Sequence, residues 1–138
     1  MTATPQLGVT PAPAPERNGQ LLKLPTAPQI YLVIDGFRHW VPNLQTFGNL
    51  FSSNATIHQD SGIGAISEGA PLSDGAVLAK GDNSPQIYLV TNQVKRWIIN
   101  PSVFNLYQFD STKVKTVPQI VIDFVTQGPN VDGPPQAS

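Results

Sequence analysis

The sequence has 138 residues, a net charge of −1 and only 12% charged residues. This length suits one ordinary domain, and the nearly neutral charge excludes the basic surface that binds nucleic acid. The chain contains no cysteine, which excludes disulfides and thiolate metal sites. No apolar run approaches the roughly 20 residues that span a bilayer, so we expect no membrane insertion, and the N-terminus lacks the pattern of a signal peptide.

The first 18 residues are rich in proline, alanine and threonine and show no helical or strand periodicity. The run at 11–15 alternates proline with alanine and favours the extended polyproline II conformation. We expect residues 1–18 to be a flexible arm. The alternative is a docking arm, in which Leu7 and Val9 insert into a neighbouring molecule.

A β-hairpin is predicted at residues 29–41, after a short strand at 21–24. Its turn is Asp35-Gly36, which favours a two-residue type I′ turn with positive φ at both positions. The same hairpin recurs at residues 86–98, where the turn is Asn92-Gln93. Because glutamine adopts positive φ less readily than glycine, we expect the second turn to be looser or longer.

The register of a two-residue turn assigns each hairpin side chain to a face. One face carries Tyr31 opposite Trp40, with Arg38 beside them. The second hairpin repeats this arrangement with Tyr88, Trp97 and Lys95. The other face is predicted to be core, with His39 as its polar exception at an edge position. The first hairpin's core-face residues are Ile30, Leu32, Ile34, Phe37, His39 and Val41.

A short helix is expected after each hairpin. Asn43 fits the N-cap of the first helix, and Phe47 and Phe51 fall on one helical face. In the second copy Asn100 takes the cap position and Pro101 the first helical position, where proline is well tolerated.

Shorter elements follow each helix. Strands are expected at 56–58 and 114–117, and a weak helical turn at 63–66. The segment at 120–125 reads as strand or helix, and Pro118 just before it favours a helix.

Two copies of one unit make up the body of the chain. Tyr31 and Tyr88 are 57 positions apart, and residues 21–47 and 78–104 are identical at 11 of 27 positions. This self-similarity predicts an internal duplication. The identical residues, in first-copy numbering, are Leu21, Lys23, Pro28, Gln29, Ile30, Tyr31, Leu32, Val33, Trp40, Asn43 and Phe47.

These patterns predict an α+β fold of two tandem repeats of about 57 residues, each a β-hairpin plus a short helix. Units of this size cannot bury separate cores, so we expect them to share one core about a pseudo-two-fold axis. The predicted boundaries are 1–18 for the arm, 19–75 for repeat 1, 76–133 for repeat 2 and 134–138 for a tail, with 19–127 as one packed domain.

Sequence signatures of catalysis are absent. The chain has no Gly-rich phosphate loop, nucleophile elbow, zinc-protease motif or EF-hand. His39 and His58 lack metal-ligand spacing, and the carboxylates at Asp35, Asp74 and Asp132 fit turn chemistry. We therefore expect a protein that is not an enzyme and has no cofactor.

The repeated pattern resembles a tandem repeat of uncharacterised function in bacterial secreted or cell-wall-associated proteins. It is carried by residues 30–41 with Phe47 and by 87–98 with Phe104. The loop at 71–75, which recurs at 129–133, completes the match. The chain departs from the pattern at Gln93, in place of glycine, and at Ile99, in place of proline. The resemblance implies a non-catalytic accessory role outside the cell or at its surface.

Two interpretations of the tyrosine-tryptophan face remain open. The face is either a packing surface beneath the short helix, with Phe47 and Phe104 above it, or a ligand platform. On the platform interpretation the protein is a binding or adhesion module that recognises a cell-surface glycan or a protein. An alternative is a structural subunit that assembles into oligomers or filaments through sheet edges and Pro-rich arms. The candidate ligand-binding residues are Tyr31, Arg38, Trp40, Tyr88, Lys95 and Trp97.

Overall fold

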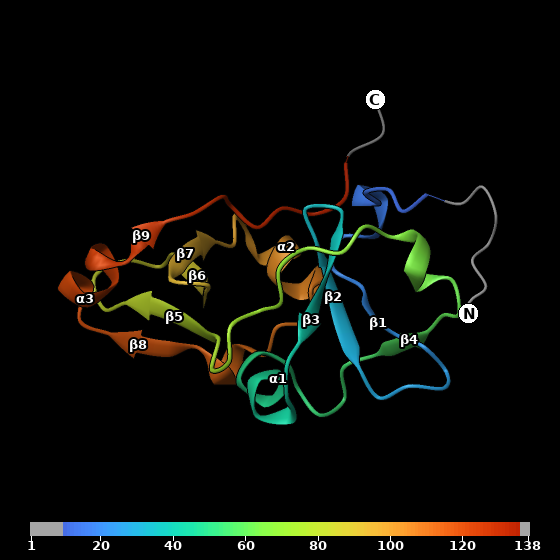
Figure 1. The fold of residues 1–138 in the computed structure, drawn as a ribbon. Coiled ribbons are helices and arrows are strands. Elements are labelled where there is room, and N and C mark those ends of the chain that lie inside the picture. The colour runs from blue at the N-terminus through green and yellow to red at the C-terminus, as the bar shows by residue number, and fades with distance from the viewer. Residues whose placement is uncertain (1–9, 136–138) are drawn as a thin grey trace.

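The computed structural model describes residues 10–135 of the chain. They form an α+β fold with two mixed β-sheets, of four and five strands, and several short helices. Figure 1 shows the two sheets toward opposite ends of an elongated molecule, with helices α1 (Leu44–Leu50) and α2 (Pro101–Leu106) between them. The α+β class predicted from the sequence is confirmed.

Four strands make the first sheet: β1 (Leu21–Lys23), β2 (Ile30–Ile34), β3 (Phe37–Val41) and β4 (Ile57–Gln59). Their order is β3-β2-β1-β4. Strand β1 pairs antiparallel with β2 and parallel with β4. The β2–β3 hairpin has the predicted register, with Tyr31 opposite Trp40.

Five strands make the second sheet: β5 (Val77–Gly81), β6 (Ile87–Thr91), β7 (Val94–Trp97), β8 (Lys115–Val117) and β9 (Thr126–Gln127). Their order is β8-β5-β6-β7-β9. Strand β5 pairs antiparallel with β6 and parallel with β8, as β1 does with β2 and β4. Strand β7 pairs in parallel with β9. At the corresponding edge of the first sheet, β3 has only a single parallel bridge, from Arg38 to Glu68.

Both hairpins turn in two residues. Asp35 and Gly36 have φ of 59° and 79°, which confirms the predicted turn. Asn92 and Gln93 also have positive φ, 55° and 68°, so the expectation of a looser second turn was wrong. The pairing of β6 with β7 begins immediately beside the turn, and this register holds Gln93 in a conformation that glutamine disfavours.

Asparagine side chains cap helices α1 and α2. Asn43 Oδ1 accepts a hydrogen bond from the Thr46 N–H at 2.8 Å, and Asn100 Oδ1 accepts one from the Val103 N–H at 2.9 Å. These are the caps predicted from the sequence. The described chain also contains three single 3₁₀ turns: η1 (Pro15–Arg17), η2 (Ile63–Ala65) and η3 (Ser111–Lys113).

One apolar core takes residues from both sheets and from helices α1 and α2. Near its centre Phe51 and Phe109 stack with ring centroids 5.5 Å apart, and their backbones form an antiparallel bridge. The hairpin face predicted as core contributes Leu32, Ile34 and Val41. The buried members of this central core are Leu21, Leu32, Ile34, Val41, Leu50, Phe51, Leu72, Ala76, Leu78, Leu89, Ile98, Val103, Phe104, Tyr107, Phe109 and Val131.

Part of the predicted flexible arm is packed against the body. Ala12 forms a parallel bridge with Ile66, and the Ala14 N–H donates to the Gly36 carbonyl oxygen at 2.7 Å. Because proline has no N–H, the alternation of proline with alanine leaves a donor only at the alanines, and both donors are used here. Residues 1–9, which include the apolar side chains of the predicted docking arm, lie outside the described part.

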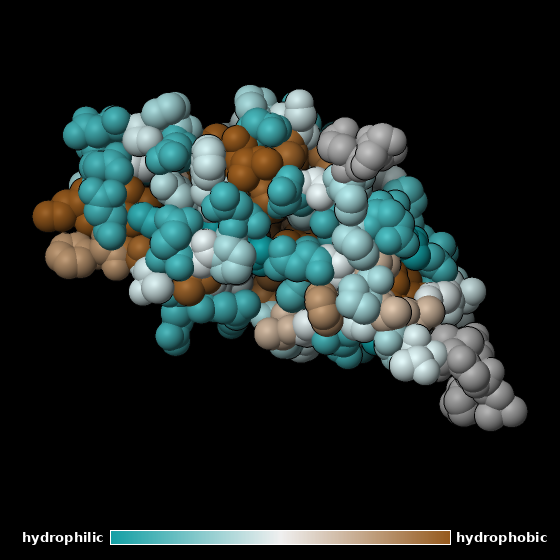
Figure 2. Space-filling model, turned by 90° about the horizontal axis from the view of Figure 1, so that it is seen from above, coloured by the Kyte–Doolittle hydropathy of each residue, from teal (hydrophilic) through white to brown (hydrophobic). Residues whose placement is uncertain are grey.

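Apolar side chains gather at the far end of the second sheet. The segment for which the sequence favoured a helix is helix α3 (Gln119–Phe124). It buries Ile122 but leaves Ile120, Val121 and Phe124 exposed. Figure 2 shows apolar side chains at the left end of the molecule, where α3 lies in Figure 1.

Candidate functional site

The chain itself covers the hairpin face that carries Tyr31 and Arg38. The Arg38 guanidinium lies 4.9 Å from the centroid of the Tyr31 ring, and its Nε donates a hydrogen bond to the Ile66 carbonyl oxygen at 3.0 Å. Tyr31 packs against a small buried cluster that contains Ala14 and Ile63. The cover therefore combines the N-terminal segment with the turn η2.

Helix α3 covers the corresponding face of the second hairpin. Tyr88 and Lys95 are both 8% exposed. The Lys95 ammonium lies 5.0 Å from the Tyr88 centroid and donates a hydrogen bond to the carbonyl oxygen of Ile122, a residue of α3, at 2.9 Å. In both halves a cation over a tyrosine ring thus holds the covering segment, and shielding from water strengthens such a contact.

The packing interpretation of this face named the short helix after each hairpin as the cover, and the structure places other segments there. Phe104 belongs to the central core and Phe47 packs against it, so neither lies in the small clusters with Tyr31 or Tyr88. Four of the six candidate residues make packing contacts beneath other segments: Tyr31, Arg38, Tyr88 and Lys95. A fifth, Trp97, packs in part against the cluster that contains Tyr88 and Ile122. The structure does not bring all six together at one open surface. Only the two tryptophans border open grooves.

Trp40 borders a hollow between the hairpin and helix α1, which we call groove 1. The indole is 36% exposed, and the groove has a volume of about 290 Å³. Its nine lining residues are Pro28, Gln29, Ile30, Trp40, Val41, Pro42, Asn43, Leu44 and Phe47.

Trp97 borders a matching hollow between the second hairpin and helix α2, which we call groove 2. Its volume is about 400 Å³. Nine of its lining residues lie 57 positions after those of groove 1, one for each, and Asn105 and Ser111 extend it. The same position in each half of the chain therefore forms a groove.

The two grooves share residue types as well as position. Six of the nine corresponding positions carry the same residue, whereas only five of the other 18 aligned positions do. Asn43 and Phe47 also have structural tasks, as a helix cap and a core contact. Gln86, the counterpart of Gln29, accepts a hydrogen bond from the Tyr88 hydroxyl at 3.1 Å. Pro28 and Pro85 are exposed, so burial does not explain why this proline recurs. The six shared residues are Pro28, Gln29, Ile30, Trp40, Asn43 and Phe47.

The walls of both grooves are mostly apolar, and none of the residues from 10 to 135 that line them is acidic or basic. Within the described residues, neither the Trp40 nor the Trp97 indole N–H donates to a protein acceptor. The Gln29 amide is likewise without a side-chain partner there. Each groove therefore offers an aromatic ring and a small number of free hydrogen-bond donors.

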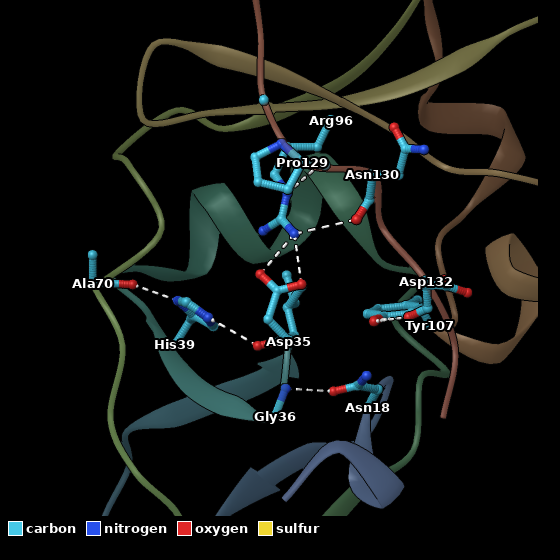
Figure 3. Close-up of polar contacts among 12 residues, drawn as sticks. Asn18, Asp35, Gly36, His39, Ala70, Arg96, Tyr107, Pro129, Asn130 and Asp132 are labelled. Atoms are coloured by element: carbon cyan, nitrogen blue, oxygen red, sulfur yellow. Dashed lines mark hydrogen bonds and ion pairs between the residues drawn. The ribbon is translucent and has the colours of Figure 1, made fainter. Parts of the chain in front are cut away.

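A polar network joins the first hairpin turn to the second half of the chain (Figure 3). Arg96 donates hydrogen bonds of 2.7 and 2.9 Å to the Asp35 carboxylate and one of 2.8 Å to the Pro129 carbonyl oxygen. The Tyr107 hydroxyl donates to the Asp132 carbonyl oxygen, and burial raises the pKa of Tyr107 above its usual range. These contacts hold the C-terminal loop against the core.

His39, the polar exception on the predicted core face, is accounted for by backbone contacts. Its Nδ1 lies 2.7 Å from the Ala70 carbonyl oxygen and its Nε2 lies 3.2 Å from that of Ile34. A ring held between two carbonyl groups is a structural element of the loop rather than an open general base.

Other site types find no support within residues 10–135. No group of three or more histidine, aspartate or glutamate side chains is placed there to hold a metal ion, and no helix there has the length and hydropathy to span a bilayer. A larger hollow of about 740 Å³ lies between α2 and residues 132–135. It has no aromatic wall and ends where the described residues end.

Sequence reasoning identified the two tryptophans but missed the other walls of the grooves. The signal was present in the duplication, because Pro28 recurs as Pro85 at the edge of each groove. Their closeness to Trp40 depends on how the hairpin meets helix α1, which periodicity does not reveal.

Comparisons with known proteins assign no family to the chain. A scan against protein-family models gave no match, and searches of curated proteins and of solved structures gave none either. The resemblance to a repeat of bacterial surface proteins therefore stays a prediction, and the two tryptophan grooves are the features on which a functional proposal rests.

Proposed function

We propose that this protein is a non-catalytic binding module that holds a ligand of a protein or glycan surface in two equivalent grooves. The observation that carries this proposal is the recurrence of the grooves, with six of nine positions identical between them. Pro28 is exposed in groove 1 and Pro85 in groove 2, and a shared ligand explains the recurrence of this proline better than folding does.

The groove chemistry supports recognition rather than catalysis. Binding sites are concave, mostly apolar and furnished with a few polar groups that set orientation. Both grooves fit that description, with Trp40 or Trp97 as the large aromatic surface. Each volume lies near the low end of ligand sites, which is roughly 300 Å³, so one groove suits one or two ring-sized groups of an extended ligand.

We also propose that the halves are repeats of one unit, related by a pseudo-two-fold axis and sharing the central core. The matched strand pairings of β1 and β5 support this. Strands β4 and β8 begin 58 positions apart, at Ile57 and Lys115, so one residue has been inserted before β8. With that insertion Phe51 corresponds to Phe109, and the contact between them fits an axis that passes near both rings.

The binding function is tested by nuclear magnetic resonance of the ¹⁵N-labelled full chain. The sequence holds two tryptophans, so each groove has its own indole N–H signal, which the Trp40→Phe and Trp97→Phe variants assign. We expect at least one of two neutral ring fragments at millimolar concentration, N-acetylprolinamide and methyl glucoside, to shift both indole signals. Two indole signals that neither fragment moves would overturn the proposal.

Self-assembly is the second candidate, and the apolar surface of α3 favours it. Phe124 is 82% exposed and Ile120 is 66% exposed, and such surfaces are typical of contact sites. The edge strands β4 and β8 support it less, because each has only three residues and they are largely exposed and polar. Sedimentation of the full chain tests this candidate: a strictly monomeric species at high concentration would exclude it.

A further inference from the structure

We propose that the ligand of both grooves is an extended, uncharged, proline-containing segment of a partner protein. This inference rests on the binding function proposed above and names the ligand class. It follows from the charge of the grooves, from their hydrogen-bond donors and from the way the fold already holds a segment of this kind.

Charge complementarity excludes an ionic ligand. Within the described part of the chain, no acidic or basic side chain lines groove 1 or groove 2. A charged ligand group that entered either groove would lose hydration without gaining a countercharge, and this is strongly unfavourable. The matching ligand is therefore uncharged along the stretch that enters the groove.

The free donors in groove 1 suit a peptide better than a sugar. The Asn43 amide is already engaged, because its Nδ2 donates to Asp74 at 2.9 Å and its Oδ1 accepts from the Thr46 N–H. Among residues 10–135, the Trp40 indole N–H and the Gln29 amide are the donors of groove 1 that remain without a partner. A sugar ring carries a hydroxyl on most of its carbons, and each buried hydroxyl needs a partner.

A polyproline II segment needs fewer hydrogen-bond partners than a sugar ring, and groove 1 can supply them. It has no internal hydrogen bonds, it presents apolar proline rings, and it docks on aromatic-lined grooves. Groove 1 pairs the Trp40 and Phe47 rings with proline walls, and one indole N–H is free for a ligand carbonyl. Groove 2 offers the same ring pair, Trp97 with Phe104.

The fold already binds one segment of this composition. The alternating run at 11–15 lies against the cluster that contains Tyr31, with Ala14 buried in it. Its two alanine N–H groups donate to carbonyl oxygens of the body, and its prolines remain exposed. A proline-alanine segment and an aromatic-bearing surface are thus compatible in this molecule.

The test uses a capped decapeptide of alternating proline and alanine, titrated into the ¹⁵N-labelled full chain. We expect both indole N–H signals to shift and calorimetry to give two peptides per chain. A capped glycine-serine decapeptide is the matched control for a flexible uncharged chain, and a hexamer of β-1,4-linked glucose represents neutral glycans. Neither is expected to shift the indoles at the same concentration.

Charged residues placed in one groove at a time separate the two sites. Leu44→Glu adds a carboxylate to groove 1 at the first residue of α1, where a negative charge favours the helix. Asn105→Arg adds a cation to groove 2 near the end of α2, where a positive charge is favourable. Each should weaken peptide binding about threefold or more at its own groove only, because the docked peptide would take water from the new charge without supplying a countercharge. The exposed Gln45→Glu and Thr116→Arg lie outside the grooves and are the matched controls.

The outcomes separate this inference from the proposed function. If the glucose hexamer shifts the indoles and the proline peptide does not, the binding function stands and the peptide inference is overturned. If the glycine-serine peptide binds equally well, the inference is also overturned. A dimer that Leu44→Glu or Asn105→Arg dissociates would assign the grooves to a second copy and overturn it too. If no probe or fragment moves either indole, both proposals are overturned.

Discussion

The two halves of the molecule cover the same hairpin face with different structures. In the first half, Tyr31 and Arg38 lie beneath the N-terminal segment and the turn η2. In the second half, Tyr88 and Lys95 lie beneath helix α3. The cation donates to a carbonyl oxygen of its cover in both, so the hairpin provides the same attachment point for two unlike segments.

This difference shows which part of each unit tolerates change. The covering segment at 63–66 contains Gly64 and forms a single turn, so it relies on added contacts from the N-terminal segment. Helix α3 is longer and buries Ile122 by itself. The grooves beside Trp40 and Trp97 instead keep most of their residues. We therefore propose that the grooves carry the function and that the covered faces serve structural support.

Truncation of the central aromatic stack should have the largest effect and should be alike in both halves. Phe51→Ala and Phe109→Ala each leave a cavity in the shared core, because both side chains are at most 5% exposed. We expect the free energy of unfolding to fall by about 3–5 kcal/mol for each, in one cooperative transition measured by urea with fluorescence and circular dichroism. The exposed Phe124→Ala is the control and should change it by less than about 0.5 kcal/mol. Separate transitions for the halves would contradict a shared core.

Arg96 and His39 occupy corresponding positions, but we expect Arg96 to contribute more to the free energy of unfolding. Arg96→Gln removes the contacts to Asp35 and Pro129, and because the Asp35 side chain is 46% exposed, water limits the loss to about 2 kcal/mol. His39→Gln removes contacts to two backbone carbonyl groups and should lower the free energy of unfolding by about 1 kcal/mol. Urea unfolding measures both. An equal or reversed order would show that the network does not join the halves as described.

The two hairpin turns should respond to substitution with opposite signs. Gln93→Gly relieves a residue held at φ of 68° and should stabilise the fold by about 1 kcal/mol. Gly36→Ala introduces the same backbone strain, and its Cβ would lie 3.1 Å from the Pro15 nitrogen, so it should destabilise by about 1–2 kcal/mol. Thermal unfolding followed by circular dichroism compares the pair. Destabilisation by Gln93→Gly would refute the strain at this turn.

Acid should loosen the cover of the first half only. The Gly62 N–H and the Arg17 guanidinium, 2.9 Å from the carboxylate, hold the pKa of Asp60 below its usual value. A lowered folded-state pKa stabilises the fold above the unfolded-state pKa of about 3.9, and this contribution is lost as pH falls through the folded-state value. Hydrogen exchange, corrected for intrinsic rates, should show that amides at 12–18 lose more protection between pH 5 and pH 3 than those of α3. Asp60→Asn should abolish that difference, and its persistence in the variant would exclude Asp60 as the cause.

Local patterns were predictable from the sequence because their causes lie within a few residues. The Asp35-Gly36 turn and the Asn43 and Asn100 caps are of this kind. The covers were not predictable, because they depend on segments that meet only in the folded chain. The prediction of a looser second turn was wrong for a similar reason. The β6–β7 register overrides the preference of Gln93 for negative φ. For the grooves, the tryptophans were found, but their other walls require the hairpin and the helix together.

We propose that the ligand-binding surface of this molecule lies at its two tryptophans. Acrylamide quenching of the single-tryptophan variants Trp97→Phe and Trp40→Phe measures each indole separately. We predict that both indoles are quenched in the free protein, and that Trp40, 36% exposed, is quenched more strongly than the half-buried Trp97. An indole that acrylamide does not reach in either variant would contradict the existence of that groove as a binding site.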